Sequence, residues 1–107
     1  MKKSFYAHLA ETEIVEQELD NLNLSEDEKK DLMQHVHSSI HYTVLDVVLS
    51  DLPENHKKKF VELVRENDHE KIWEHVKENT LEIEEKIRSG IKVLTNEFLD
   101  EIKKVKS

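Results

Sequence analysis

The chain has 107 residues and a formal net charge of −8, with 37% charged residues, one glycine, one proline and no cysteine. A chain of this length forms one domain with one hydrophobic core, so residues 1–107 are expected to form a single helical domain. The lack of cysteine excludes disulfides and thiolate chemistry. The scarcity of turn residues argues against an all-β fold.

The charge and hydropathy pattern also argues against two classes of partner. Nucleic-acid binding requires a basic face, which an acidic chain does not offer. No apolar run approaches the roughly 18 residues of a membrane span, and the first apolar segment ends at Glu11, too early for a secretion signal. We therefore expect a soluble cytoplasmic protein with no nucleic-acid and no membrane partner.

The first predicted helix covers residues 4–20 and has a thin apolar edge. That edge consists of Phe5, Leu9, Ile14 and Leu19. From residue 4 to residue 28 there are eight acidic residues and no lysine or arginine. One interpretation is that residues 1–21 form a mobile acidic arm that docks on a basic partner. The other is that the acidic residues form a solvated helix face.

The second predicted helix, residues 25–50, contains the most apolar stretch of the chain. Eight of the thirteen residues from Ile40 to Leu52 are apolar, and they are not confined to one stripe. A helix that is apolar nearly all round is usually buried on all sides, so we expect other helices to pack around this half. The first half carries a narrower stripe, which consists of Leu32, Met33, Val36 and Ile40.

Three further helices are expected at residues 52–66, 68–78 and 80–105. Four predicted helix starts place a capping side chain three residues before a glutamate, the spacing of a capping box. The four pairs are Ser25 with Glu28, Asp51 with Glu54, Asn67 with Glu70, and Asn79 with Glu82. The fold class is therefore all-α, a compact bundle of four main helices plus an N-terminal helix.

The last predicted helix has the longest regular stripe. Its members are Ile83, Ile87, Ile91, Leu94, Phe98, Ile102 and Val105. Their intervals of three and four residues are typical of a helix that lies along a partner helix. Gly90 adjoins this stripe, and since glycine costs helix stability, it indicates the close approach of another helix.

The helix lengths add a constraint on the packing. The second helix would span roughly 40 Å at about 1.5 Å per residue, whereas a compact chain of this size has a radius of gyration near 13 Å. Either this helix bends, or a second copy of the chain covers its surplus apolar surface.

Three sequence segments resemble a family of small all-helical proteins of unknown function from candidate-phyla bacteria. These are LNLSEDEKKDL, VLDVVLSDLPE and KKFVELVRENDHEKIWEHVKEN. The resemblance covers about residues 22–98 and follows the order of elements, including a Leu-Pro-Glu junction between helices. It implies an all-α fold and no known activity.

The chain has seven histidines, and His37 and His41 lie one helical turn apart on the apolar side of the second helix. Residues four apart stand above one another, so both imidazoles can reach one metal ion. Three interpretations stay open: hydrogen-bonded structural histidines, a pH-sensitive interface, and a divalent metal site whose remaining ligands the sequence does not identify.

The sequence lacks a glycine-framed serine elbow and a glycine-rich phosphate loop, so we predict a protein that is not an enzyme and has no cofactor. The preferred function is a protein–protein interaction or self-association module, with a homodimer as the expected assembly. The predicted interface consists of Met33, His37, His41, Val44, Val48, Ile87, Gly90, Ile91 and Leu94. The alternatives are a metal-binding or pH-sensing protein that uses His37 and His41, and an acidic inhibitor or immunity-type protein that docks through the Glu11–Glu28 segment.

Overall fold

The structure, a computed structural model, describes residues 5–10 and 12–106, and it contains no strand in these ranges. The described residues form one short 3₁₀ helix and five α-helices. These are η1 (Ala7–Leu9), α1 (Glu13–Asp20), α2 (Glu26–Asp51), α3 (Glu54–Glu66), α4 (His69–Asn79) and α5 (Ile83–Lys106). The expected all-α fold is confirmed.

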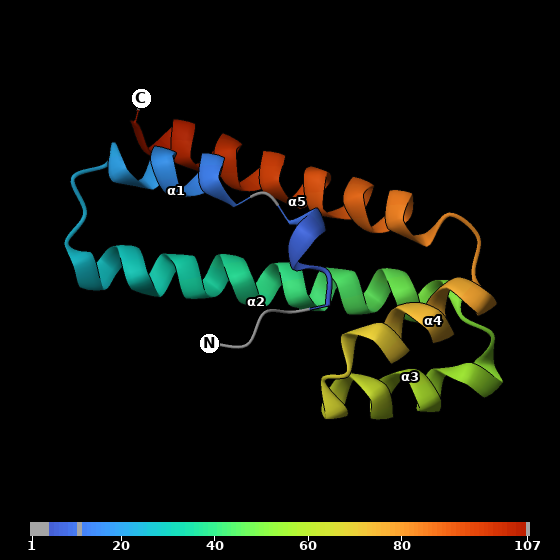
Figure 1. The fold of residues 1–107 in the computed structure, drawn as a ribbon. Coiled ribbons are helices and arrows are strands. Elements are labelled where there is room, and N and C mark those ends of the chain that lie inside the picture. The colour runs from blue at the N-terminus through green and yellow to red at the C-terminus, as the bar shows by residue number, and fades with distance from the viewer. Residues whose placement is uncertain (1–4, 11, 107) are drawn as a thin grey trace.

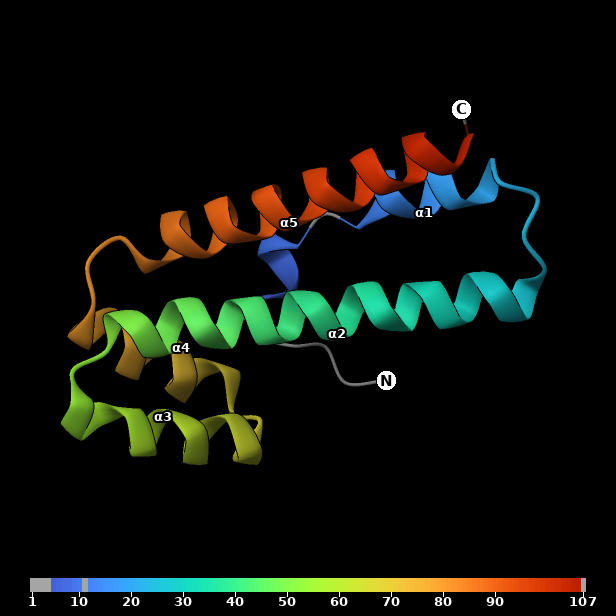
Figure 2. The same cartoon turned by 180° about the vertical axis from the view of Figure 1, so that it is seen from behind.

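The helix α2 runs through the middle of the molecule, as both views show (Figures 1 and 2). On one side lie α5, antiparallel to α2, and the shorter α1. On the other side the α3–α4 hairpin lies against the half of α2 that ends at Asp51. The molecule measures 47 × 25 × 19 Å and its radius of gyration is 15.6 Å, above the roughly 13 Å of a compact domain. The body is thus elongated along its two long helices.

The contact between α2 and α5 forms the main part of the core, and we call it the α2–α5 seam. Four residues of α2, spaced four apart, are buried: Val36, Ile40, Val44 and Val48. The facing α5 buries its isoleucines at Ile83, Ile87, Ile91 and Ile102. Because each set recurs at helical spacing, each helix presents one continuous apolar stripe to the core.

Gly90 of α5 lies at a close approach of the two helices. A Cβ atom added there would be 3.2 Å from Cγ2 of Val47 and 3.5 Å from Cγ2 of Thr43. A side chain at this position would push against α2, which explains a glycine in the middle of a helix despite its cost. The close approach predicted from Gly90 is therefore present within one chain.

The expectation that the second half of α2 is covered on all sides is wrong. Tyr42 is 67% exposed, and the flanking apolar residues Leu45, Val47 and Leu49 are only half-buried. The reason is geometric: α5 covers one side of α2, the α3–α4 hairpin covers another side of its second half, and a third side stays open to solvent (Figure 1).

Only the first of the four predicted capping boxes forms. The Ser25 hydroxyl accepts the Glu28 backbone N–H, and the Glu28 carboxylate accepts the Ser25 backbone N–H. Asp51 instead belongs to α2, which ends because Leu52 precedes Pro53 and adopts an extended conformation. Pro53 then occupies the N-cap position of α3 without a side-chain cap.

The two boxes led by asparagine are also wrong. Asn67 ends α3 in the left-handed conformation at φ 58°, which asparagine tolerates better than most residues. Asp68, one residue later, caps α4 by accepting the Lys71 backbone N–H. Asn79 is the last residue of α4, and its side-chain amide donates to the carbonyl of His75.

The predicted N-terminal helix at residues 4–20 is interrupted, and Ser4 and Glu11 lie outside the described residues. The backbone leaves the 3₁₀ helix at Ala10, which is extended. This break shifts the helical phase, so Val15 is 1% exposed whereas the predicted core residue Ile14 is 51% exposed. The other three predicted edge residues, Phe5, Leu9 and Leu19, are buried as expected.

The capping box at Ser25 yields a test of how α2 begins. Replacing Ser25 with Ala removes the acceptor for the Glu28 N–H and should lower the free energy of unfolding by about 1 kcal/mol at pH 7. Chemical denaturation followed by circular dichroism measures the loss. Ser89→Ala, at an exposed interior position of α5, is the matched control and should not destabilise the chain.

The same cap has a defined pH dependence. The hydrogen bonds from Ser25, that of its backbone N–H first, lower the pKa of Glu28. A lowered folded-state pKa means that this stabilisation is present above the unfolded-state pKa and is lost as pH falls through the folded-state value. The stability difference between the native chain and Glu28→Gln should therefore shrink in acid. A pH-independent difference would contradict this role of the carboxylate.

Candidate functional site

The exposed side of α2 is the first candidate site. We call its residues Gln34, His37, Ser38, His41 and Tyr42 the open flank. Their spacing of three and four residues places them along one side of α2. All are exposed except the half-buried His41. Along the first half of α2, α1 and α5 lie on one side of the helix, and no described helix lies on the opposite side (Figures 1 and 2).

The open flank belongs to an uncharged segment of a highly charged chain. Residues 32–45 contain no aspartate, glutamate, lysine or arginine, although these residues make up 37% of the sequence. Burial explains only part of this, because Leu32, His35 and most of the open flank are exposed. Protein interfaces are depleted of charged residues at their centre and enriched in tyrosine and methionine. The surface of α2 therefore has the composition of an interface.

His41 connects the open flank to the N-terminal segment. The Tyr6 hydroxyl and Nδ1 of His41 are hydrogen-bonded at 3.1 Å, and the two ring centroids are 6.0 Å apart. The His41 ring also meets Tyr42 at 5.8 Å with an edge-on geometry. These contacts fit the structural interpretation of His41, since they give a half-buried imidazole a hydrogen-bonding partner.

Most of the other predicted interface residues lie in the α2–α5 seam. Four of them are at most 3% exposed: Val44 and Val48 on α2, and Ile87 and Ile91 on α5. The two pairs pack between α2 and α5 within one chain. Leu94 and Met33 are half-buried beside this core, and Gly90 faces Val47. For the four buried residues the predicted intermolecular contact is thus replaced by an intramolecular one. Among the predicted interface residues, the structure leaves His37 exposed.

The predicted metal ligands His37 and His41 have no third ligand nearby in the described part of the chain. Across residues 5–10 and 12–106, no group of three or more His, Asp or Glu side chains is placed to hold a metal ion. Two ligands do not make a zinc site. A metal site at His37 and His41 would need ligands from a second molecule, and it stays a prediction.

The described part of the acidic segment is packed on the core. Val15 and Leu19 of α1 are buried, and Lys29 of α2 forms ion pairs with Asp20 at 2.5 Å and Glu16 at 3.4 Å. The hydrogen bond to Asp20, followed by smaller contributions, raises the pKa of Lys29. The cation of α2 thus neutralises part of the acidic face of α1 and ties the two helices together.

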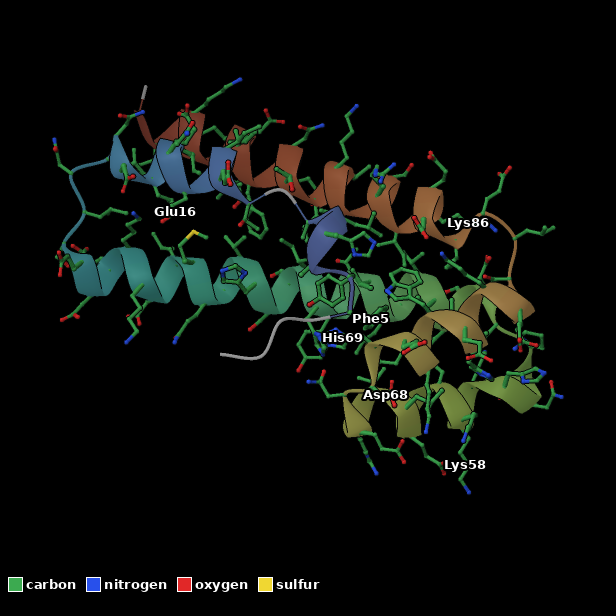
Figure 3. All side chains as sticks on the ribbon, in the orientation of Figure 1. Phe5, Glu16, Lys58, Asp68, His69 and Lys86 are labelled. Atoms are coloured by element: carbon green, nitrogen blue, oxygen red, sulfur yellow. The ribbon has the colours of Figure 1, made fainter. Side chains whose placement is uncertain are left out.

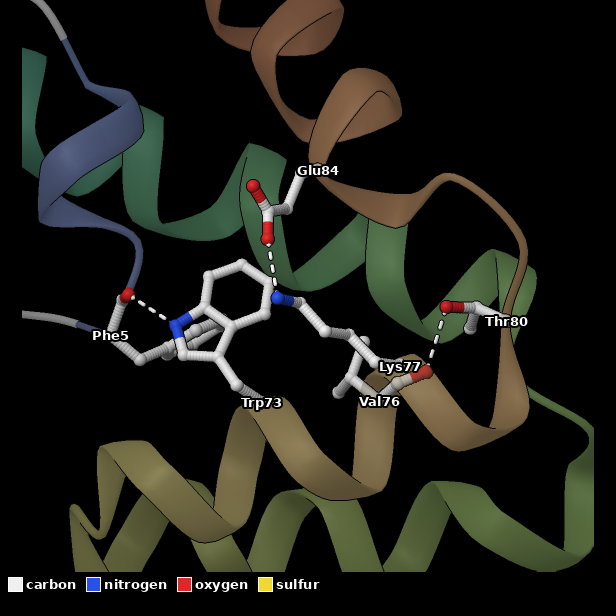
Figure 4. A network of polar contacts seen from close by, with 6 residues as sticks. All are labelled: Phe5, Trp73, Val76, Lys77, Thr80 and Glu84. Carbon is white, nitrogen blue, oxygen red and sulfur yellow. Dashed lines mark hydrogen bonds and ion pairs between the residues drawn. The ribbon is translucent and has the colours of Figure 1, made fainter.

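A second candidate site surrounds Trp73, and Figure 4 shows it from close by. The indole Nε1–H of Trp73 donates to the carbonyl of Phe5 at 2.8 Å. The Phe5 ring meets Trp73 at 5.4 Å and Phe60 at 6.1 Å, both edge-on. Phe60 is 0% exposed and Phe5 is 5% exposed. Three aromatic residues from the N-terminal segment, α3 and α4 thereby form one cluster.

Charged groups border this aromatic cluster. Nζ of Lys77 lies 5.6 Å from the centre of the Trp73 ring, a cation–π distance. The same ammonium group forms an ion pair of 2.7 Å with Glu84 at the start of α5. The hydrogen bond from Lys77 is the largest contribution that lowers the pKa of Glu84. This chain of contacts joins the N-terminal segment, α4 and α5.

No pattern in the sequence predicts this cluster. Phe5 and Trp73 are 68 positions apart, and single-sequence periodicity carries no information on such pairing. The only available signal was that Phe5 and Trp73 are large aromatic residues on separate predicted helices, each with an apolar stripe. Trp73 itself is half-buried, and its indole nitrogen is hydrogen-bonded.

A hollow of about 520 Å³ lies where the end of α2 meets the start of α5. Asp46, Asp51 and Glu85 contribute carboxylates to its walls, and Lys86 contributes an ammonium group. Nζ of Lys86 already donates to Asp51 at 2.7 Å. Figure 3 shows Lys86 at this end of the molecule. The ammonium group of the hollow is thus paired with one of its three carboxylates.

No known protein family matches the sequence, and neither a curated protein nor a solved structure is similar enough to be identified as a relative. The resemblance of residues 22–98 to the candidate-phyla family therefore stays a prediction. Within the described residues, no helix is both long enough and apolar enough to cross a membrane.

The Lys77–Glu84 ion pair yields a test of the charged border of the aromatic cluster. Lys77→Met removes the hydrogen-bond donor and should raise the pKa of Glu84 toward that of an ordinary glutamate. A carboxyl-carbon NMR titration of the variant and the native chain measures this shift. Lys71→Met is the control, because Lys71 pairs with Asp68 at the other end of α4. An unchanged Glu84 titration in Lys77→Met would exclude the pair.

Proposed function

We propose that this chain is a non-enzymatic interaction module that self-associates through the open flank of α2. The observation that carries the proposal is the uncharged surface of residues 32–45, on which Tyr42 is 67% exposed. A large aromatic side chain is costly to leave in water, and tyrosine is among the residues that contribute most to binding energy in protein interfaces.

The charge of the chain supports a second copy as the partner. Two copies of a chain with a net charge of −8 repel each other over most of their surfaces. The open flank is a place where two copies can meet without like-charge contacts. In a twofold dimer the same patch serves both subunits, so an uncharged patch is complementary to itself. Glutamine and serine side chains there can donate and accept hydrogen bonds across the axis.

The two alternative functions stay predictions from the sequence. For the metal-binding alternative, the described part of one chain supplies only two ligands, His37 and His41. The inhibitor alternative draws on the acidic residues of α1 and the start of α2, of which Glu16 and Asp20 already pair with Lys29. Neither has a contact in the structure that favours it over self-association.

Self-association is tested by the solution mass. Light scattering behind a sizing column, in chelator at neutral pH, should give the mass of two chains. Tyr42→Lys places a charge at the centre of the interface and should reduce the mass to one chain, because an unpaired cation would be buried. Val93→Lys is the matched control: Val93 is 60% exposed on α5, away from the open flank, and this variant should keep the native mass.

Ionic strength provides an independent readout. Because the net charge of both copies is negative, added salt screens their repulsion and should increase the dimer fraction at a fixed protein concentration. A native chain that stays monomeric at all concentrations and ionic strengths would overturn the proposal. So would a Tyr42→Lys variant that keeps the mass of two chains.

A further inference from the structure

The N-terminal residues Phe5–Leu9, which we call the strap, fill an aromatic site made by other parts of the chain. Phe5, Tyr6 and Leu9 are 4–6% exposed. Their surroundings come from four helices: the strap contacts His41 of α2, Phe60 of α3 and Trp73 of α4, and its 3₁₀ helix η1 also packs against α5. In Figure 3, Phe5 lies between α2 and the α3–α4 hairpin. The strap therefore bridges the hairpin and the long helices.

The contacts of the strap are those of a bound peptide. Two adjacent aromatic side chains enter the site, and the Phe5 carbonyl accepts the Trp73 indole N–H at 2.8 Å. The Tyr6 hydroxyl meets Nδ1 of His41 at 3.1 Å. Deep aromatic side chains provide binding energy, while hydrogen bonds to the backbone and the tyrosine hydroxyl fix the register. The site thus holds a segment with two neighbouring aromatic residues.

The strap is also separable from the rest of the fold. It has only one 3₁₀ turn, with hydrogen bonds from Leu9 N to Tyr6 O at 2.8 Å and from Ala10 N to Ala7 O at 3.2 Å. Both bonds stay within the segment. The next helix, α1, has its own buried anchors at Val15 and Leu19, and Ala10 before it is extended. Terminal segments that lie outside the main helices have a lower free energy of local opening than the core has.

From this geometry we infer that the strap is a releasable, autoinhibitory plug in a docking site for aromatic peptide segments. Its release uncovers Phe60, Trp73 and His41 while α1 stays in place. The partner is a peptide segment with two adjacent aromatic side chains, like the Phe5–Tyr6 pair that the site holds in the closed state. The strap competes with this partner, since both need the Trp73 indole N–H and the same apolar surface. The inference does not require self-association through the open flank, although His41 belongs to both surfaces.

A synthetic peptide of residues 1–12, labelled with fluorescein, tests the site directly. In the full-length variant Phe5→Ala/Tyr6→Ala the strap loses both anchors, and fluorescence anisotropy should show that the peptide binds. The native chain should bind the same peptide at least tenfold more weakly, because its own strap competes. The control is the peptide with the same two alanine substitutions, which should bind neither protein.

Two outcomes of this experiment would overturn the inference. One is a folded variant, with native helical circular dichroism, that does not bind the peptide. The other is equal binding by the native chain and the variant, which would place the peptide outside the strap site. Because His41 belongs to both surfaces, both proteins are assayed at a concentration at which light scattering gives the mass of one chain, so neither outcome depends on whether the chain forms dimers.

If the double variant does not fold, hydrogen exchange on the native chain tests the same inference without any substitution. The Leu9 amide and the indole N–H of Trp73, the sole tryptophan of the sequence, should exchange through release of the strap. Their exchange should be at least tenfold faster than that of the Val44 amide in the seam. Exchange of all three groups at the rate of global unfolding would overturn the inference.

Discussion

The close approach of α2 and α5 at Gly90 is the contact on which the rest of the structure depends. Without a side chain there, the two longest helices lie together with Val47 and Thr43 directly against the α5 backbone. The valine and isoleucine stripes on both sides of this point then become fully buried, and burial of such side chains is the main stabilising contribution in a small domain. The seam also sets the elongated shape, because it aligns the two helices along their length.

Because α5 occupies one side of α2, the other elements can cover only its remaining sides. The strap and the α3–α4 hairpin cover its second half, where Phe60 and Trp73 meet Phe5. The first half keeps an uncovered side, and this side lies in the uncharged part of the chain. Both proposed binding surfaces thus follow from one arrangement: one is a part of α2 that no described helix covers, and the other is covered by the short N-terminal strap. His41 touches both surfaces.

The sequence predicted the helices and the Ser25 cap well because these depend on local chemistry. It failed where tertiary contacts decide. The periodicity around Ile14 and Val15 fits two phases, and the break at Ala10 selects the second. Apolar stripes such as the one containing Ile87 indicate burial without saying whether the covering helix belongs to the same chain. The strap site joins residues 68 positions apart, which no local pattern reveals.

A double-mutant cycle between Gly90 and Val47 tests the seam most directly. Gly90→Ala should be more favourable in the Val47→Ala background than in the native chain, by about 1 kcal/mol in the free energy of unfolding, because the new methyl group then has room. The parallel cycle of Gly90→Ala with Val93→Ala should show no coupling, since Val93 faces solvent. Equal effects of Gly90→Ala in the native and Val47→Ala backgrounds would contradict the close contact of α2 and α5.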